Sequence, residues 1–220
     1  MDLSASSEDY ISAIWKFVEW TGKAPSSTAL AKKLDLSPST VSEGITRLVR
    51  QGLVSHAPYG SVELTGRGQK EAARLVRGHR VIETALVRFL GYTWDEVHEE
   101  AERLEHAASP KLIGKLDALL GYPSHDPHGD PIPRLDGTAE NNSVGSPLSD
   151  AAPGHSYRIE RVSDQFPNLL QYLSSVDVEV GTVITVDTIG SGTGIMHMSS
   201  PGGPLALSLP AAESILVTAI

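Results

Sequence analysis

Residues 26–51, SSTALAKKLDLSPSTVSEGITRLVRQ, decide the fold of the first part of the chain. Serines precede two patterns of apolar residues at helical spacing, which predict helices over residues 28–34 and 40–51. The turn between them, Leu36-Ser37-Pro38-Ser39, is short enough for a helix-turn-helix. The surrounding elements that we expect are a helix and two short strands, over residues 8–21, 53–54 and 62–65. Together they predict a winged helix-turn-helix.

Such a motif presents its second helix to the major groove of DNA, where small polar side chains at the helix start reach base edges. We therefore expect DNA contacts from the start and outer face of this helix, namely from Ser37, Pro38, Ser39, Thr40, Ser42, Glu43, Arg47 and Arg50. The net charge of −9 argues against nucleic acid, but residues 21–74 carry eight basic and four acidic side chains. DNA binding is thus favoured over a three-helix scaffold for protein contacts alone.

The amino-acid composition excludes several classes of protein and of functional site. The 220 residues are 40% hydrophobic and 20% charged, as in an ordinary globular protein with a buried core. The absence of cysteine excludes disulfides, thiolate zinc sites and cysteine nucleophiles. No apolar run approaches the ~18 residues of a membrane span, and the first residues lack a signal-peptide pattern. We therefore expect no membrane partner and a cytoplasmic location.

The rest of the chain divides into a helical part and a strand-rich tail. Three more helices are expected over residues 68–90, 93–108 and 110–120. Residues 121–154 are rich in Pro, Gly, Asp, Asn and Ser, which indicates a linker. From Ser156 onward the pattern predicts five short strands and one helix over residues 165–174, typical of a small β-barrel. The predicted fold is mainly α over the N-terminal two-thirds, followed by this barrel.

The helix expected over residues 93–108 carries four potential metal ligands on one face: His98, Glu102, Glu105 and His106. The preceding helix adds His79 and Glu83, one turn apart. Imidazole and carboxylate groups bind transition metals, and side chains one turn apart converge on one ion. A metal site is therefore favoured over a solvated charged face. We interpret the remaining histidines as surface residues: His56, His125, His128, His155 and His197.

Clusters of histidine and glutamate also build hydrolytic zinc sites and di-metal oxygenases, so a metal-dependent enzyme is an alternative function. The chain contains neither His-Glu-x-x-His nor the Glu-x-x-His that di-iron bundles require twice. The residue three positions before His106 is Arg103. An enzyme would also leave the winged motif unexplained. A metal-independent DNA-binding protein is a second alternative.

The combination of these motifs resembles the diphtheria toxin repressor family of metal-dependent transcriptional repressors. The resemblance rests on the winged motif Ser37–Ser42, His79-x-x-x-Glu83, His98 with Glu102-x-x-Glu105-His106, and the segment Asp126–Pro133. It covers nearly the whole chain. It implies a winged DNA-binding domain over residues 1–73, a helical metal-binding and dimerisation domain over 74–140, a linker over 141–155 and an SH3-like domain over 156–220.

The resemblance also implies two metal sites. The primary site would consist of Asp9, Glu102, Glu105 and His106, and the ancillary site of His79, Glu83 and His98 with Asp164 from the tail. Asp9 and Glu102 stand where iron-sensing members have Met and Cys. Hard oxygen ligands suit manganese, so the chain resembles the manganese-responsive, MntR-type branch. Two positions depart from the family: Ser12 replaces a second N-terminal carboxylate, and Pro167 replaces a glutamine of the ancillary site.

The resemblance thus implies a function and its partners. A homodimer would bind Mn²⁺ at two sites per subunit, bind a palindromic operator and repress manganese-uptake genes, with no small-molecule substrate. An iron-responsive repressor of the same family is the alternative. Fe²⁺, Co²⁺ or Zn²⁺ would also bind in vitro, because affinity rises along the divalent series.

Overall fold

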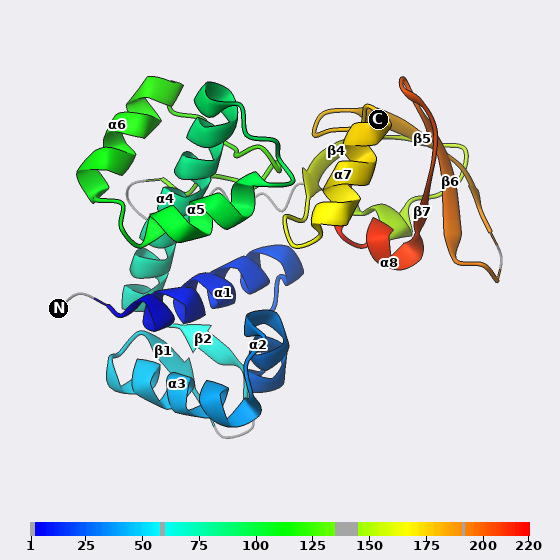
Figure 1. Cartoon of the computed structure of the whole chain (residues 1–220). Helices are drawn as coiled ribbons and strands as arrows, with labels where there is room; N and C mark the ends of the chain where they lie inside the picture. Colours follow the sequence, from blue (N-terminus) through cyan, green and yellow to red (C-terminus); the bar gives the residue numbers. More distant parts are fainter. Residues whose placement is uncertain (1–2, 58–59, 135–144, 191) are drawn as a thin grey trace.

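The computed structural model describes residues 3–57, 60–134, 145–190 and 192–220. In the first part of the chain, the order of elements is that of a winged helix-turn-helix (Figure 1). Its elements are α1 (Ala5–Thr21), α2 (Ser27–Leu34), α3 (Pro38–Arg50), β1 (Val54–His56) and β2 (Val62–Leu64). The helices and strands expected here are all present, with small shifts at their ends.

Helix caps and one close contact define this winged unit. Ser26 and Ser37 are the N-caps of α2 and α3, and their hydroxyls accept hydrogen bonds from backbone N–H groups of the first turns. Gly44 of α3 lies against Tyr10 of α1, where an added Cβ would stand 2.5 Å from the ring. The shared core is apolar and includes Ile11, Ile14, Leu30, Val41, Ile45, Leu48, Val54 and Val62. α3 therefore buries one face and leaves the other exposed.

A long helix, α4 (Gly66–Leu90), packs against α1 and against α5 (Val97–Glu105) and α6 (Pro110–Leu120). α5 is shorter than the helix predicted over residues 93–108. Trp94 and Asp95 form a turn, because they bind the tail: Trp94 Nε1 donates to Ser174 Oγ at 2.6 Å, and Asp95 accepts from Gln171 at 2.9 Å.

In the described part of the chain, no helix is long and apolar enough to cross a membrane.

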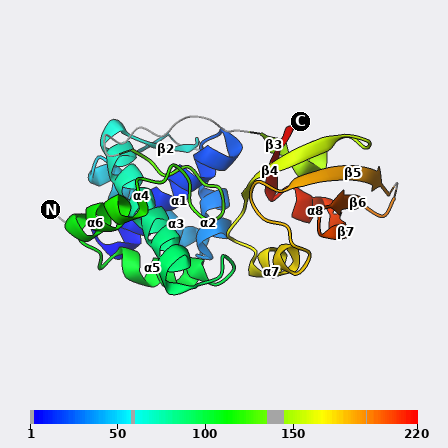
Figure 2. The same ribbon diagram turned by 90° about the horizontal axis from the view of Figure 1, so that it is seen from above.

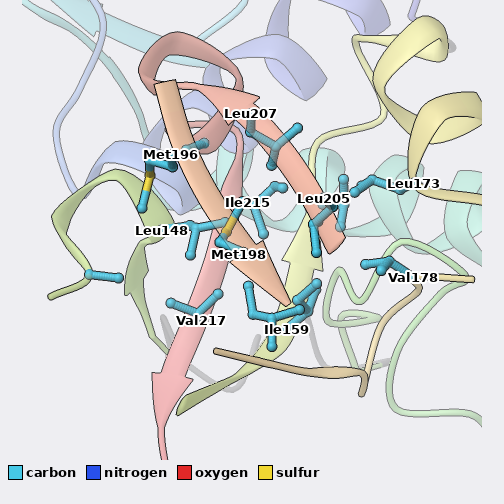
Figure 3. Packing of buried hydrophobic residues seen from close by; sticks show 14 of the residues in the cluster. Leu148, Ile159, Leu173, Val178, Met196, Met198, Leu205, Leu207, Ile215 and Val217 are labelled. Carbon is cyan, nitrogen blue, oxygen red and sulfur yellow. The ribbon is translucent and has the colours of Figure 1, made fainter. Parts of the chain in front are cut away.

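The tail is a six-stranded antiparallel sheet with short helices on it. Its strands are β3 (Ser146–Pro147), β4 (Ser156–Val162), β5 (Val183–Ile189), β6 (Ile195–Ser200), β7 (Gly203–Ser208) and β8 (Ile215–Ala219), in the order β3-β8-β4-β5-β6-β7. Its helices are the 3-10 turn η1 (Leu148–Asp150), α7 (Pro167–Ser175) and α8 (Leu209–Ala212). The sheet curves around an apolar core without pairing β3 to β7 in the described residues. Figure 3 shows Ile159, Met198, Leu205 and Ile215 within this core.

The end of the predicted linker belongs to the tail. Ser146 and Pro147 pair with β8, and Leu148 is fully buried in the tail core. The part of that linker before Gly145 lies outside the described residues, except for the segment that ends at Arg134. A strand of two residues has no detectable alternation, so only its pairing with a distant strand identifies it.

A buried ionic cluster joins the tail to the helices, which lie side by side in Figure 2. Arg80 of α4 and Arg161 of β4 both contact Glu19 of α1, with Nη2–Oε2 distances of 2.6 and 3.2 Å. Between α6 and β3, Asp126 pairs with Arg80, and Asp130 pairs with both arginines. Both arginines are almost fully buried, so loss of an acid would leave their buried charge less well compensated. The cluster therefore joins α1, α4 and β4.

Candidate metal centre

Four residues form what we call the ancillary group: His79, Glu83, His98 and Asp164. His79 and Glu83 lie one turn apart on α4 and are almost fully buried. His79 Nε2 lies 3.0 Å from Glu83 Oε1, and His98 Nδ1 of α5 lies 3.1 Å from the same oxygen. Asp164 follows β4 and brings its Oδ2 to 3.1 Å from His98 Nδ1. One ligand atom of each residue lies within 4.8 Å of the others.

Three residues form the primary group: Asp9, Glu105 and His106, whose ligand atoms also lie within 4.8 Å of one another. His106 Nε2 lies 3.1 Å from Asp9 Oδ1 and 3.6 Å from Glu105 Oε1. Asp9 comes from α1, whereas Glu105 and His106 lie at the end of α5, so the group joins two units of the fold. The structure does not bring Glu102 into this group. Its Oε1 lies 3.3 Å from Nε2 of His98, and its side chain is 60% exposed.

Two residues of α1 contact these groups although sequence reasoning missed them. Glu8 Oε2 accepts a hydrogen bond from His106 Nδ1 at 2.8 Å. Lys16 Nζ lies 3.9 Å from Asp164 Oδ2. Lys16 could have been predicted from its spacing, because Asp9 and Lys16 lie two helical turns apart and hence on one face of α1.

His128 is not the surface residue that we predicted. It is fully buried, and its Nε2 lies 2.6 Å from the backbone oxygen of Trp94, to which it donates. Its Nδ1 faces Glu83 Oε2 at 3.9 Å, and neither atom has a hydrogen-bond partner. With Asp126, these two residues form a third cluster of potential ligands that shares Glu83 with the ancillary group. The sequence around His128 is polar, which is typical of a surface loop, so its burial was not predicted. The loop is buried because Gly129 brings the chain against β4.

The donor atoms of both groups fit a divalent transition metal. All are imidazole nitrogens or carboxylate oxygens, the donors of manganese, iron and zinc sites. Burial raises the pKa of Asp164, but Lys16 and His98 outweigh this effect and lower the pKa to about 2, so its carboxylate is ionised. Glu83 Oε2 and His128 Nδ1, which have no hydrogen-bond partner, are two further potential ligand atoms beside the ancillary group.

Without an ion, protons occupy these imidazoles. His79 lies between Glu105 and Glu83, with carboxylate oxygens 2.6 and 3.0 Å from its two ring nitrogens. Burial lowers the pKa of His98, but hydrogen bonds to carboxylates of α4 and α5 outweigh this and raise the pKa to about 10. The pKa values of His79 and His106 are raised too, against burial, by neighbouring carboxylates. A neutral ring has a single N–H, so rings with acids on both sides are held as imidazolium.

All eight residues predicted to contact DNA are exposed at the start and outer face of α3. Several of them also make local hydrogen bonds. Ser37 caps α3 through its contact with the Thr40 N–H, and Arg47 donates to Ser6 Oγ of α1 at 3.1 Å. Arg67, in the first turn of α4, donates to the Gln51 carbonyl at the end of α3. The recognition face is therefore free of the apolar core but anchored to the rest of the winged unit.

Three models of known protein families match successive parts of the chain. The family model described as the iron-dependent repressor N-terminal DNA-binding domain matches residues 2–62. The model described as the metal-binding and dimerisation domain of the iron-dependent repressor matches residues 65–134. A FeoA domain model matches residues 146–219.

Individual relatives extend over nearly the same length. The chain is 31% identical to the iron-dependent repressor IdeR of Mycobacterium leprae, over 97% of this chain and 93% of the relative. It is 32% identical to the diphtheria toxin repressor of Corynebacterium diphtheriae, over 84% of this chain and 85% of the relative. A solved manganese-dependent transcriptional repressor in complex with manganese is 39% identical, with a TM-score of 0.89, covering 97% of this chain and 100% of that chain.

Proposed function

The chain belongs to the iron-dependent repressor family, that of the diphtheria toxin repressor, and we propose that it is a manganese-responsive member of it. Members are metal-dependent transcriptional repressors and not enzymes, so the enzyme interpretation is abandoned. The matched DNA-binding and dimerisation domains make operator DNA and a second copy of the chain its partners. We propose further that this operator is palindromic and controls genes for manganese uptake.

The observation that carries this proposal is the purely oxygen- and nitrogen-based ligand set. Asp9 supplies a carboxylate to the primary group, and the residue one turn before His106, Glu102, is also an acid. The chain has no cysteine that could supply a sulfur ligand. Hard donors of this kind suit manganese better than later metals. The similarity to a manganese-dependent repressor also supports it. The name of the mycobacterial relative supports the iron-responsive alternative.

A substitution pair separates the two metals. Asp9→Met with Glu102→Cys introduces two soft donors, one in place of a carboxylate of the primary group and one at Glu102, the acid one turn before His106. It should shift the metal that promotes operator binding from manganese towards iron or cobalt. The measurement is operator binding titrated with each metal. Glu99→Gln, at an exposed acid of α5, is the matched control and should leave the preference unchanged. An unaltered manganese preference in the double variant would mean that these positions do not ligate.

DNA binding has its own test, a gel shift with and without Mn²⁺. We expect operator binding by the wild type only with the metal; binding in both conditions would support a metal-independent protein. Arg50→Ala should weaken binding to all sequences and reduce the salt dependence, because a phosphate contact is lost. Ser39→Ala and Ser42→Ala should instead change discrimination between operators. Arg158→Ala, at an exposed position of β4, is the control for loss of positive charge.

A further inference from the structure

Lys16 places a cation inside the ancillary group. It lies on α1, and its ammonium is 3.9 Å from Oδ2 of Asp164, the oxygen that also lies 3.1 Å from His98 Nδ1. The Lys16 side chain is only 18% exposed. Apart from Asp164, the acids whose charge acts on it include Glu83 and Glu105. The ammonium therefore sits against ligand atoms of the ancillary group and not in solvent.

A buried carboxylate needs a compensating positive charge. At Asp164 this charge comes from the imidazolium of His98 and from Lys16. Binding of a divalent ion removes the proton of His98, but it has no comparable way to remove the charge of Lys16. The ion and the ammonium would then compete for one carboxylate oxygen. Two cations held this close repel each other strongly where water is excluded.

We propose that Lys16 is a built-in competitor of the ancillary metal, which holds Asp164 in the metal-free protein and lowers the affinity of the ancillary group for divalent ions. The inference rests on the proposed function, since it requires that the ancillary group binds metal. Lys16 thereby sets the metal concentration at which the ancillary group fills. It also keeps the tail in contact with α1 before any ion is bound, because Asp164 follows β4 and Lys16 belongs to α1.

The primary group differs in this respect. The basic side chain beside it, Arg74, pairs with Glu8 and not with a ligand: Arg74 Nη2 lies 3.5 Å from Glu8 Oε1, and Glu8 is outside the group of converging ligand atoms. The Arg74 side chain is also half exposed, so solvent screens its charge. Replacement of Lys16 should thus act mainly at the ancillary group, and the primary group is removed from the test because the charge of Lys16 also reaches Glu105.

The test is calorimetric titration of Mn²⁺ in an Asp9→Ala background, which removes a ligand of the primary group alone. Lys16→Met should tighten Mn²⁺ binding by about tenfold or more, because one competing charge is removed. Lys16→Arg, which keeps the charge, and Lys32→Met, at an exposed lysine of α2, should both bind as the Asp9→Ala parent does. Equal or weaker binding by Lys16→Met would overturn the proposal and leave Lys16 as an ordinary structural ion pair.

Thermal unfolding gives a second readout that does not depend on the calorimetric fit. Metal-free Lys16→Met should unfold at a lower temperature than the wild type, since Asp164 loses one of its two positively charged partners. Addition of Mn²⁺ should raise its Tm more than that of the wild type, and an equal or smaller rise would contradict the proposal. If no variant binds Mn²⁺ in the Asp9→Ala background, the inference is overturned. A metal-dependent gel shift of the wild type would in that case still support the proposed function.

Discussion

Glu105 Oε2 lies 2.6 Å from His79 Nδ1, so a carboxylate of the primary group is hydrogen-bonded to an imidazole of the ancillary group. The other oxygen of Glu105 lies 3.6 Å from His106 Nε2. One side chain at the end of α5 thus contacts both groups. The two groups are therefore parts of one electrostatic unit.

The first prediction follows from this shared contact. Glu105→Gln keeps the shape of the side chain but removes its charge, so it should weaken Mn²⁺ binding at both groups. At the primary group it removes a ligand, and at the ancillary group it removes the carboxylate that orients His79, a loss of about 10–100-fold in affinity for contacts of this kind. Calorimetry gives both affinities. Glu100→Gln, which pairs with Arg103, is the control on the same helix, and loss at the primary group alone would contradict the prediction.

The second prediction concerns protons. Because the pKa of His98 is raised from 6.5 to about 10, the metal-free protein holds this proton at neutral pH and must release it when the imidazole binds an ion. Apparent Mn²⁺ affinity should therefore rise between about pH 6.5 and 8, by about tenfold per unit for each proton released. The gain should end above the folded-state pKa, where the proton is already lost.

Calorimetry in buffers of different ionisation enthalpy counts these protons. We expect release of at least about one proton per ancillary group. His125→Gln, at an exposed histidine outside both groups, should leave the number unchanged. A heat of binding that is independent of the buffer would show that His98 is neutral before the ion binds.

Local features of the sequence predicted most of the helices and the two ligand pairs on them. Ser26 and Ser37 mark helix starts because a cap acts within one turn, and His79 and Glu83 share a face because of helix geometry alone. Both arguments need no knowledge of the rest of the fold. The tail strands other than β3 were likewise predicted from their short apolar segments.

Long-range packing determined what the sequence could not reveal. The burial of His128 depends on the approach of its loop to Glu83 and to the backbone of Trp94. The direction of Glu102, towards His98 and away from the primary group, depends on how α5 lies on α4. Lys16 was overlooked for a similar reason, since its partner Asp164 is in the tail.

The third prediction concerns the stability of the winged unit. Gly44→Ala places a Cβ 2.5 Å from the buried ring of Tyr10, so α1 and α3 must separate. Overpacking of this kind costs about 1–3 kcal/mol. Gly66→Ala, at a helical glycine with no atom within 4 Å of the added Cβ, is the matched control and should change stability by less than about 1 kcal/mol. Chemical denaturation of the metal-free protein measures both, and equal stability of the two variants would contradict the close contact.

The fourth prediction concerns coupling between metal and operator. α1 packs Ile11 and Ile14 into the core of the winged unit, and its Asp9 joins Glu105 and His106 of α5 in the primary group. Burial raises the pKa of Asp9, and the charge of Glu105 adds to this, so the two carboxylates oppose each other when no ion is bound. An ion bound by both elements would restrict α1, and with it α3, to one position relative to the helical part.

If operator DNA selects that position, operator and metal must tighten each other's binding by the same factor. We expect operator DNA to increase Mn²⁺ affinity by about 5–150-fold, the equivalent of about 1–3 kcal/mol. The measurement is calorimetric titration of Mn²⁺ with and without operator. The double variant Arg47→Ala, Arg50→Ala should bind Mn²⁺ normally but show no gain with DNA, because its contacts with phosphate are lost. Equal Mn²⁺ affinities of the wild type in the two titrations would exclude this coupling, even if the protein binds both ligands, because reciprocity follows from thermodynamics alone.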